Sequence, residues 1–465
     1  MHFTIRRSSR LMGLAALSLL AAANLQFAQA ADDPYANQQW NMTQIHALSA
    51  QSISTGSGVK IGIIDSGVSR NHEDLVGRIA ATATCVGTSG AAHQCQSGAD
   101  HGDDIDGHGT HVAGIAAALT GNGKGVSGVA PGVQLVVARV FSRDGNGEPT
   151  ATLDDVRAGI RWVLDQGVKV VNLSIGAEEQ GFNVCQVFAN CQSPLKGAVE
   201  EVWQRGALPV IAAGNSQVYS TQGYGDLDAI VVGAVGPSDT IASYSTPIGD
   251  AKWGMVAPGG DPQSTQDVAR MVLSTYAGST CDPPDSGSCY AYLSGTSMAA
   301  PHVSAVAAML FSRGVGRQAV VDTLLSTTDP VECGSNCSGR LNAAKALGVT
   351  TTDNSVIAGG PMGNGAATTT TAKKSSGNTG STPKTTTKNS SSSSTTAAGA
   401  FGFDSGAVIG RRTPTARQPQ EALVLNNASA EDGVPATVLV LGMASLAGAA
   451  LTLSYSLRKT LTTLP

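Results

Sequence analysis

Charged residues are scarce in this chain, and those present are not clustered. Only 14% of the 465 residues are Asp, Glu, Lys or Arg, and the net charge is −5. Lysines and arginines are scattered along the sequence. Because proteins that bind nucleic acid usually carry a basic patch or stripe, the sequence argues against nucleic acid as a partner.

The C-x2-C spacing typical of zinc sites is also missing. The eight cysteines instead fall into close pairs. In an exported protein such cysteines usually form disulfides, although sequence alone does not fix which cysteine bonds to which. We expect near neighbours to pair: Cys85 with Cys95, Cys185 with Cys191, Cys281 with Cys289, and Cys333 with Cys337.

The first 30 residues predict export. Arginines in the first ten residues precede an apolar stretch over 11–23, and Ala28-Gln29-Ala30 follows. This is the pattern of a secretory signal peptide over residues 1–30. The apolar stretch is shorter than the roughly 20 residues that a membrane-spanning helix needs. We therefore expect cleavage after Ala30; the alternative is an uncleaved N-terminal anchor.

Residues 31–348 are expected to form one α/β domain. Apolar, β-rich runs alternate with helical patterns, which favours a parallel central sheet with helices on both faces. One helix is clearly bounded, because Thr152 caps its start and Gly167 ends it. A second helix is expected over Ser297–Ser312. The expected strands are Val59–Ile64, Leu135–Phe141, Val168–Ile175, Ala207–Ala213 and Ile230–Val235.

The remainder of the chain does not resemble a second domain. Residues 349–433 include a stretch rich in Ser, Thr, Ala and Gly that cannot bury enough apolar surface to fold, so we expect a mostly disordered linker. Residues 434–457 carry no charge and are long enough to cross a bilayer, and the short basic tail 458–465 favours a cytoplasmic C-terminus. We expect a transmembrane helix; the alternative is a sorting signal that is removed.

Three segments far apart in sequence each carry one member of a nucleophilic triad. Asp65 ends a strand-like apolar run, His108 stands between two glycines, and Ser297 stands at the start of an expected helix. A helix N-terminus favours developing negative charge. Ser297 would attack a carbonyl carbon, His108 would take and return its proton, and Asp65 would orient the imidazole. Taken singly, each residue also has a structural explanation, as a turn, core or cap residue.

The order and surroundings of these residues resemble the subtilisin, or subtilase, family. The motifs that carry the resemblance are Ile61–Gly67, Asp106–Gly114 and Leu293–Val303. The resemblance covers nearly all of residues 33–348, and the segment 33–45 is similar to the thermitase-like branch. It implies a subtilisin-like fold and a serine endopeptidase that acts on polypeptide substrates.

The same resemblance implies an oxyanion residue and a substrate cleft. Asn215 matches the family's oxyanion asparagine and would act together with the backbone N–H of Ser297. An extended substrate would bind by adding a strand to the protein. The substrate-binding residues implied are Ser174, Ile175 and Gly176 on one rim, Ala213 and Gly214 before the asparagine, and Gly145 on the opposite rim.

A structural calcium site is implied as well. In related enzymes it joins an N-terminal Asp, a carboxylate shortly after the catalytic Asp, and a loop that interrupts the histidine helix. Carboxylates, amides and backbone carbonyls suit this hard cation. The matching residues are Asp33, Asp74, Leu119, Asn122, Lys124 and Val126, with Lys124 offering only its carbonyl. The alternative is a solvated glycine-rich loop.

Taken together, the sequence predicts a monomeric, exported serine endopeptidase held at the cell envelope by its C-terminal segment or released by processing. Two alternatives stay open. One is a dedicated maturation protease of a secretion system, similar to the mycosins, which would cleave one cognate substrate but not casein. The other is an inactive, envelope-anchored peptide-binding protein, which would bind peptides without turnover.

Overall fold

A computed structural model describes most of residues 33–349. Within that range the residues left out are 146, 148, 176–194, 216–224, 265, 279–280 and 282–286, and beyond it only the backbone of 407–409 and 424–426 is described. Several predicted features therefore lie outside the described residues: the signal peptide, Gly176, the Cys185 and Cys191 pair, and the apolar segment 434–457.

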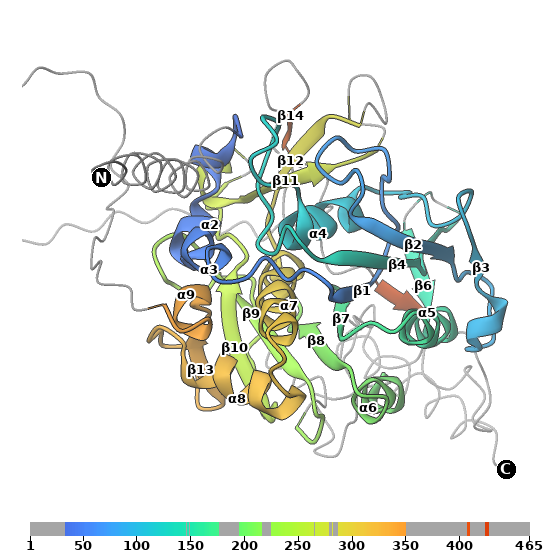
Figure 1. Ribbon diagram of the computed structural model, residues 1–465. Helices are drawn as coiled ribbons and strands as arrows, with labels where there is room; N and C mark the ends of the chain where they lie inside the picture. Colours follow the sequence, from blue (N-terminus) through green and yellow to red (C-terminus); the bar gives the residue numbers. More distant parts are fainter. Residues whose placement is uncertain are drawn as a thin grey trace, which may run out of the picture.

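A nine-stranded, mostly parallel sheet forms the centre of the domain (Figure 1). Among its described strands only β2 and β3 pair antiparallel. The predicted parallel α/β architecture is therefore confirmed. In spatial order the strands are β13 (Cys337–Arg340), β10 (Trp253–Pro258), β9 (Ile230–Val235), β8 (Leu208–Ala212), β7 (Val170–Leu173), β1 (Lys60–Asp65), β4 (Gln134–Arg139), β2 (Ile79–Thr84) and β3 (Gln96–Ser97).

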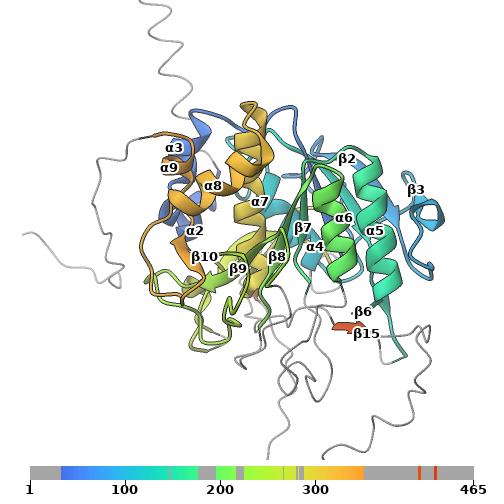
Figure 2. The same ribbon diagram turned by 90° about the horizontal axis from the view of Figure 1, so that it is seen from below.

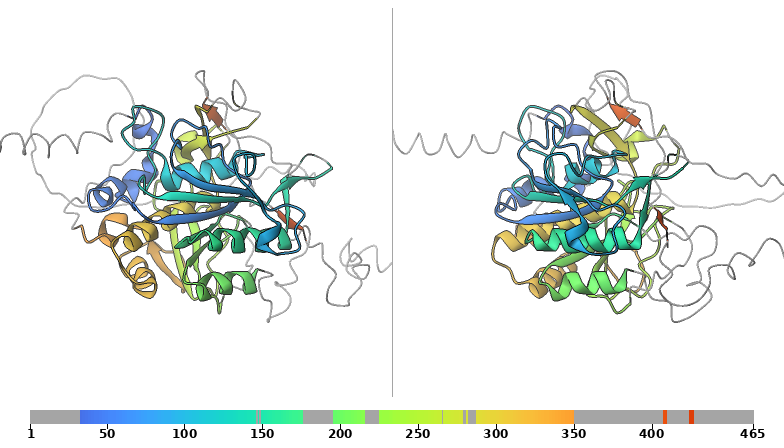
Figure 3. Two further views of the ribbon diagram at one scale, coloured as in Figure 1. Left: turned by 45° about the vertical axis from the view of Figure 1, so that its right-hand side comes forward. Right: turned by 90° about the vertical axis from the view of Figure 1, so that its right-hand side faces the viewer.

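Helices cover both faces of this sheet, as Figures 2 and 3 show. The helices α4 (His108–Ala117) and α7 (Thr296–Ser312) lie on one face, and α5 (Leu153–Asp165) and α6 (Lys196–Gln204) lie on the other. The remaining helices are α2 (Trp40–Gln44), α3 (Ala47–Gln51), α8 (Arg317–Ser326) and α9 (Ala343–Ala346), with 3-10 turns η2 (Ala36–Gln38), η3 (Ala92–Gln94) and η5 (Val268–Arg270).

The sequence explains why these elements form. In β1 the side chains of Ile61 and Ile63 enter the core beneath α4 and α7, whereas Ile64 enters the core beneath α5 and α6. A strand covered on both faces needs an apolar centre, which is why the residues between Lys60 and Asp65 are Ile and Gly only. At the start of α5 the Thr152 hydroxyl accepts the Asp155 N–H at 3.1 Å, as predicted for the cap.

Two smaller sheets flank the central one. The hairpin of β11 (Val272–Tyr276) and β12 (Cys289–Leu293) packs against α4. The additional strands are β14 (Ala407–Ile409) on β12, and β5 (Ser142–Arg143), β6 (Pro149–Thr152) and β15 (Val424–Asn426) in the second small sheet. Strands β14 and β15 fall in the stretch that the sequence predicts to be a linker. No helix in the described part of the chain is long and apolar enough to cross a membrane.

Disulfides connect near neighbours in sequence, as predicted. The bonded pairs among the described residues are Cys85 with Cys95, Cys281 with Cys289, and Cys333 with Cys337. The Cys281 to Cys289 bond closes the loop of the β11–β12 hairpin, and the Cys333 to Cys337 bond closes the loop that leads into β13. Each bond thus closes a short loop next to a strand, and Cys85, Cys281 and Cys289 are themselves buried in the core.

Candidate active site

Three neighbouring strands bring the predicted site residues to one edge of the sheet. Strands β8, β7 and β1 are adjacent and parallel, so their carboxyl ends meet at that edge. Asp65 is the last residue of β1, Ser174 directly follows β7, and Asn215 stands three residues after β8. Ligand sites of open α/β sheets form at such strand ends.

Asp65 and His108 form a buried pair. The Nδ1 atom of His108 lies 2.8 Å from Oδ1 of Asp65, and neither side chain is more than 1% exposed. Asp65 Oδ1 also accepts the Ser66 N–H at 2.7 Å, which fixes the carboxylate. Because a carboxylate only accepts hydrogen bonds, it holds the imidazole proton on Nδ1 and leaves Nε2 as the acceptor.

Opposing influences act on the pKa of His108. Burial by itself lowers this pKa, but the adjacent Asp65 carboxylate favours the charged imidazolium, and Asp106 and Asp104 add to its effect. The net result is a pKa raised above the usual 6.5. An imidazole with a raised pKa is a stronger base, which suits a group that must take a proton from a hydroxyl.

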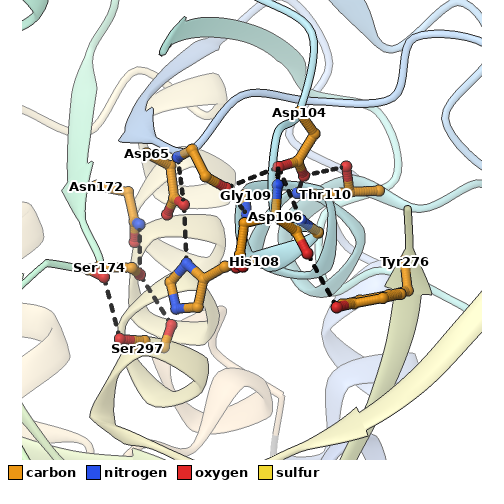
Figure 4. Close-up of polar contacts among 12 residues, drawn as sticks. Asp65, Asp104, Asp106, His108, Gly109, Thr110, Asn172, Ser174, Tyr276 and Ser297 are labelled. Atoms are coloured by element: carbon orange, nitrogen blue, oxygen red, sulfur yellow. Dashed lines mark hydrogen bonds and ion pairs between the residues drawn. The ribbon is translucent and has the colours of Figure 1, made fainter. Parts of the chain in front are cut away.

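Asp104 fixes the start of α4, a role that sequence reasoning missed. The helix begins at His108, but its cap residue Gly107 has no side chain to receive the first N–H groups. Asp104 Oδ1 accepts the N–H of Gly107 at 2.9 Å, and its Oδ2 accepts the N–H of Thr110 at 2.8 Å. Oδ1 also accepts the hydroxyl of Ser66 at 2.8 Å. One carboxylate thereby ties the histidine helix to Ser66, the residue beside Asp65. Figure 4 shows Asp104 next to Thr110 at the start of this helix.

Ser297 stands in the first turn of α7 and is fully buried. In Figure 4 the Nε2 edge of His108 points toward Ser297. The Ser297 hydroxyl, however, donates to the main-chain carbonyl of Ser174 at 3.0 Å, and Nε2 of His108 has no hydrogen-bond partner among the described residues. The structure thus contains the Asp–His half of the expected triad, with the serine hydroxyl bonded to the neighbouring strand.

Asn215 is oriented by the start of α7. Its Oδ1 accepts the backbone N–H of Thr296 at 2.9 Å and the Thr296 hydroxyl at 3.0 Å. The Gly214 N–H donates in turn to that hydroxyl at 3.0 Å. Because a backbone N–H only donates, this contact identifies the oxygen of the amide, so Nδ2 lies on the side away from Thr296.

Three of the other residues predicted for substrate binding follow the strands at this edge. Ser174, Ile175 and Ala213 are buried beside the triad strands. Gly145, two residues after β5, is exposed to solvent and has no atom near the position of a side chain. Gly176 lies outside the described residues.

Asp33 and Asp74 converge on one loop, as the implied calcium site requires. Asp33 accepts the N–H groups of Gly121 and Asn122 at 2.9 and 3.0 Å, and Asp74 accepts the Asn122 side-chain amide at 2.8 Å and the Val126 N–H at 2.9 Å. Both carboxylates are at most 3% exposed, and no described Lys, Arg or His side chain forms an ion pair with either. Burial raises the pKa of Asp74 to about 6, since the hydrogen bonds only partly offset it and Asp33 adds to it.

Tyr290 links this loop to the hairpin, a contact that sequence reasoning missed. Its hydroxyl donates to Asp74 Oδ2 at 2.9 Å. A Cβ atom on Gly125 would lie 2.0 Å from the Tyr290 ring, so the loop must carry glycine there. Lys124, whose side chain was not expected to bind a cation, turns its ammonium to Glu73 at 2.9 Å.

His111 has a structural position in α4. Its Nε2 lies 3.0 Å from the carbonyl of Ala291 and 3.2 Å from that of Val272, one on each strand of the hairpin. Burial lowers its pKa to about 3. His111 is therefore neutral and joins α4 to the hairpin behind the site.

A family comparison agrees with this geometry. Residues 56–356 match the peptidase family described as the subtilase family. The chain belongs to the subtilase family. Subtilases are serine endopeptidases. The match to this family covers well over half of the chain.

Curated subtilases support the same assignment. The chain is 35% identical over 327 residues to thermitase from Thermoactinomyces vulgaris, covering 68% of this chain and 98% of thermitase. It is 33% identical over 324 residues to the thermophilic serine proteinase of Bacillus sp. (strain AK1), covering 68% of each. The predicted resemblance to the thermitase-like branch is thereby confirmed.

Solved structures share the fold. A protease from Pseudoalteromonas arctica PAMC 21717 matches with a TM-score of 0.55 and 28% identity, over 68% of this chain and 98% of that one. The nisin leader peptidase from Lactococcus lactis matches with a TM-score of 0.52 and 24% identity, over 68% and 94%. At that identity the second likeness concerns the fold alone.

Proposed function

We propose that this subtilase hydrolyses peptide bonds of extended polypeptides through an acyl-enzyme on Ser297, with Asp65 and His108 as the other triad members. The observation that carries the proposal is the buried Asp65–His108 pair, whose unoccupied Nε2 edge points toward the serine in the first turn of α7. Buried polar atoms normally have partners. An unpartnered Nε2 beside a serine is what a general base awaiting its substrate requires.

The chemistry begins when the Ser297 hydroxyl turns from the Ser174 carbonyl toward His108. Nε2 takes the hydroxyl proton as Oγ bonds to the scissile carbonyl carbon, and the imidazolium that forms is stabilised by Asp65. The same proton then passes to the leaving amine as the peptide bond breaks. Water repeats the sequence, giving its proton to Nε2 and releasing the acid product and the free Ser297 hydroxyl.

Asn215 and the first turn of α7 would stabilise the oxyanion. The contact of Asn215 Oδ1 with Thr296 supports this role, because it leaves Nδ2 as the donor and fixes its direction before substrate arrives. The Ser297 N–H at the helix start is the second donor in this proposal. Donors fixed in advance need no reorganisation during the reaction.

Substrate would lie as an extra strand between the rim at Ser174–Gly176 and the rim at Gly145, beside Ala213 and Gly214. In this arrangement a substrate backbone N–H competes with the Ser297 hydroxyl for the Ser174 carbonyl. Substrate binding would then release the hydroxyl toward His108. Recognition through main-chain atoms predicts cleavage of many unfolded polypeptides, not of one cognate sequence.

The residues around Asp33 and Asp74 fit a structural calcium ion. Two buried carboxylates without a bonded cationic side chain require charge compensation. The proposed ligands are the side chains of Asp33, Asp74 and Asn122 and the carbonyls of Leu119, Lys124 and Val126. Asn122 donates its backbone N–H to Asp33 and its side-chain Nδ2 to Asp74, while its Oδ1 accepts the Lys124 N–H at 2.9 Å. To present oxygen to the ion, the amide would have to turn and give up these two side-chain contacts. The ion would brace the loop that follows α4.

We also propose that the protein is exported and works as a monomer at the cell envelope. The signal-like residues 1–30 and the disulfides of the described domain support export. The uncharged segment 434–457, followed by basic residues, supports a membrane tether or a processed sorting tail.

The test is Ser297→Ala, assayed on unfolded casein and on short extended peptides. We expect kcat/KM to fall by about 10⁶-fold, the scale on which triad serines act. Ser312→Ala, at the other end of the same helix, is the matched control and should retain full activity, since its hydroxyl bonds only the far end of α7 and Ser54. Full activity in Ser297→Ala would refute the proposal, and cleavage of a single cognate substrate but not casein would refute the broad specificity.

A further inference from the structure

Pro301 leaves the main-chain carbonyl of Ser297 without its helical partner. In an α-helix the carbonyl of residue 297 would accept the N–H of residue 301. Residue 301 is a proline inside α7 and has no N–H to donate. Ser297 is fully buried, so leaving its carbonyl without a donor would cost free energy.

The Ser174 hydroxyl supplies that donor. Its Oγ donates to the Ser297 carbonyl at 2.8 Å, while the Ser297 hydroxyl donates back to the Ser174 carbonyl at 3.0 Å. Both residues are fully buried. The strand end at Ser174 and the first turn of α7 therefore hold each other through two opposed hydrogen bonds (Figure 4).

Two more buried side chains set the direction of the Ser174 hydroxyl. Ser304 Oγ donates to Oδ1 of Asn172 at 2.8 Å, and Nδ2 of Asn172 donates to Ser174 Oγ at 2.8 Å. A hydroxyl has one proton, so Ser174 accepts from Asn172 and must donate elsewhere, which is to Ser297. Ser304 and Asn172 are at most 1% exposed. Polar groups placed this deep in an apolar core specify one arrangement when all of them are bonded.

We propose that the Ser174 side chain, directed by Asn172 and Ser304, is a positioning residue for the nucleophile. It replaces the hydrogen bond that Pro301 removes, and it thereby holds the backbone of Ser297 so that Oγ moves between the Ser174 carbonyl and His108. This inference rests on the proposed role of Ser297. It assigns to the Ser174 hydroxyl a function separate from substrate binding by its main chain.

The first test is Ser174→Ala in the full-length protein, assayed on a short peptide. We expect kcat to fall about ten-fold with KM within about two-fold of the parent, because one hydrogen bond to the nucleophile is lost and the substrate-binding main chain stays. Ser304→Ala should lower kcat less, because Ser304 reaches Ser174 through two hydrogen bonds by way of Asn172. Ser312→Ala should not change kcat. If Ser174→Ala matches Ser312→Ala in kcat, the inference is wrong.

The second test separates positioning from general destabilisation. Pro301→Ala restores a backbone N–H that reaches the Ser297 carbonyl. Adding Ser174→Ala to Pro301→Ala should therefore lower kcat by less than about three-fold. If the fold-loss of kcat in the double variant equals the product of the two single losses, the inference is overturned, whatever the unfolding temperatures are. Ser297→Ala is measured beside these variants. If it is inactive and the losses of kcat multiply in the double variant, only the positioning role is refuted. If it is active, the proposed function itself fails.

Discussion

Two pairs of buried ionisable side chains in this domain are compensated in different ways. Asp65 faces an imidazole that can carry the opposite charge, so the pair is complete within the protein. Asp33 and Asp74 instead converge on Asn122, and the donors that the described residues offer them are neutral. The first pair raises the pKa of its histidine, whereas in the second pair burial and the like charge raise the pKa of Asp74.

The difference indicates what each site lacks. Removing a carboxylate from water costs several kcal/mol unless an opposite charge or enough hydrogen bonds replace the water. In the Asp65–His108 pair, Oδ2 of Asp65 and Nε2 of His108 have no hydrogen-bond partner among the described residues, and a serine hydroxyl can bond to Nε2. The Asp33–Asp74 pair lacks positive charge, which a cation from solution supplies. One site is thus expected to act on substrate and the other to bind an ion for stability.

Of the changes to these two pairs, Asp65→Asn is expected to have the largest effect. An asparagine amide does not hold the imidazole in the required tautomer, so kcat/KM should fall on the order of 10⁴-fold, the scale known for other serine proteases. In the parent, His108 must be neutral to act as base, and kcat/KM should fall as pH drops through its raised pKa. Removing the carboxylate lowers that pKa, so the acidic limb of the remaining activity should move to lower pH.

The matched control for this change is Asp165→Asn, which removes an exposed carboxylate that pairs with Arg205 at 2.7 Å. It should alter neither the rate nor the pH profile. Steady-state rates from pH 5 to about 10 make the comparison. An Asp65→Asn variant with a loss below about ten-fold, or with an unmoved acidic limb, would contradict the assigned role of Asp65.

A smaller effect, on stability, is expected from removing calcium. Chelation should lower the unfolding temperature by roughly 5–10 °C, since an ion at 100 times its Kd contributes about 3 kcal/mol to a domain of this size. Added calcium should restore it. Asp74→Asn should unfold at the same temperature with and without calcium, because the ion loses a charged ligand. Thermal unfolding followed by circular dichroism measures the shift.

Two crossed controls sharpen the contrast between the pairs. Asp65→Asn should keep the full calcium-dependent shift in unfolding temperature, and Asp74→Asn with a folded domain should keep most of its kcat. If neither chelator nor added calcium changes the unfolding temperature of the parent protein, neutral hydrogen bonds alone are enough to stabilise the buried carboxylates of Asp33 and Asp74.

The strands that could be predicted are those buried on both faces. Val59–Ile64 is apolar except for Lys60 and Ile230–Val235 is apolar throughout, and they correspond to β1 and β9 within one residue. Strand β2 was missed because its residues Ile79–Thr84 are mostly alanine and threonine and only partly buried. Strand β13 was missed because it is short and contains glycine.

The site was predictable only where single motifs carry it. Asp65, His108, Ser297 and Asn215 each stand in a recognisable segment, but the hydrogen bonds that orient them join residues far apart in the chain. The Ser174–Ser297 contacts join residues 123 positions apart, so no local sequence pattern predicts them. Asp104 is the exception, because an acidic residue shortly before a helix whose cap is glycine is a signal that could have been used.

The most direct test of the central claim is covalent labelling with a phosphonofluoridate that reacts with activated serines. We expect about one label per folded chain, located on Ser297 by peptide mass spectrometry, and none in His108→Ala at the same reagent concentration. Label on another serine, or an equal labelling rate of Ser297 when His108 is absent, would contradict it.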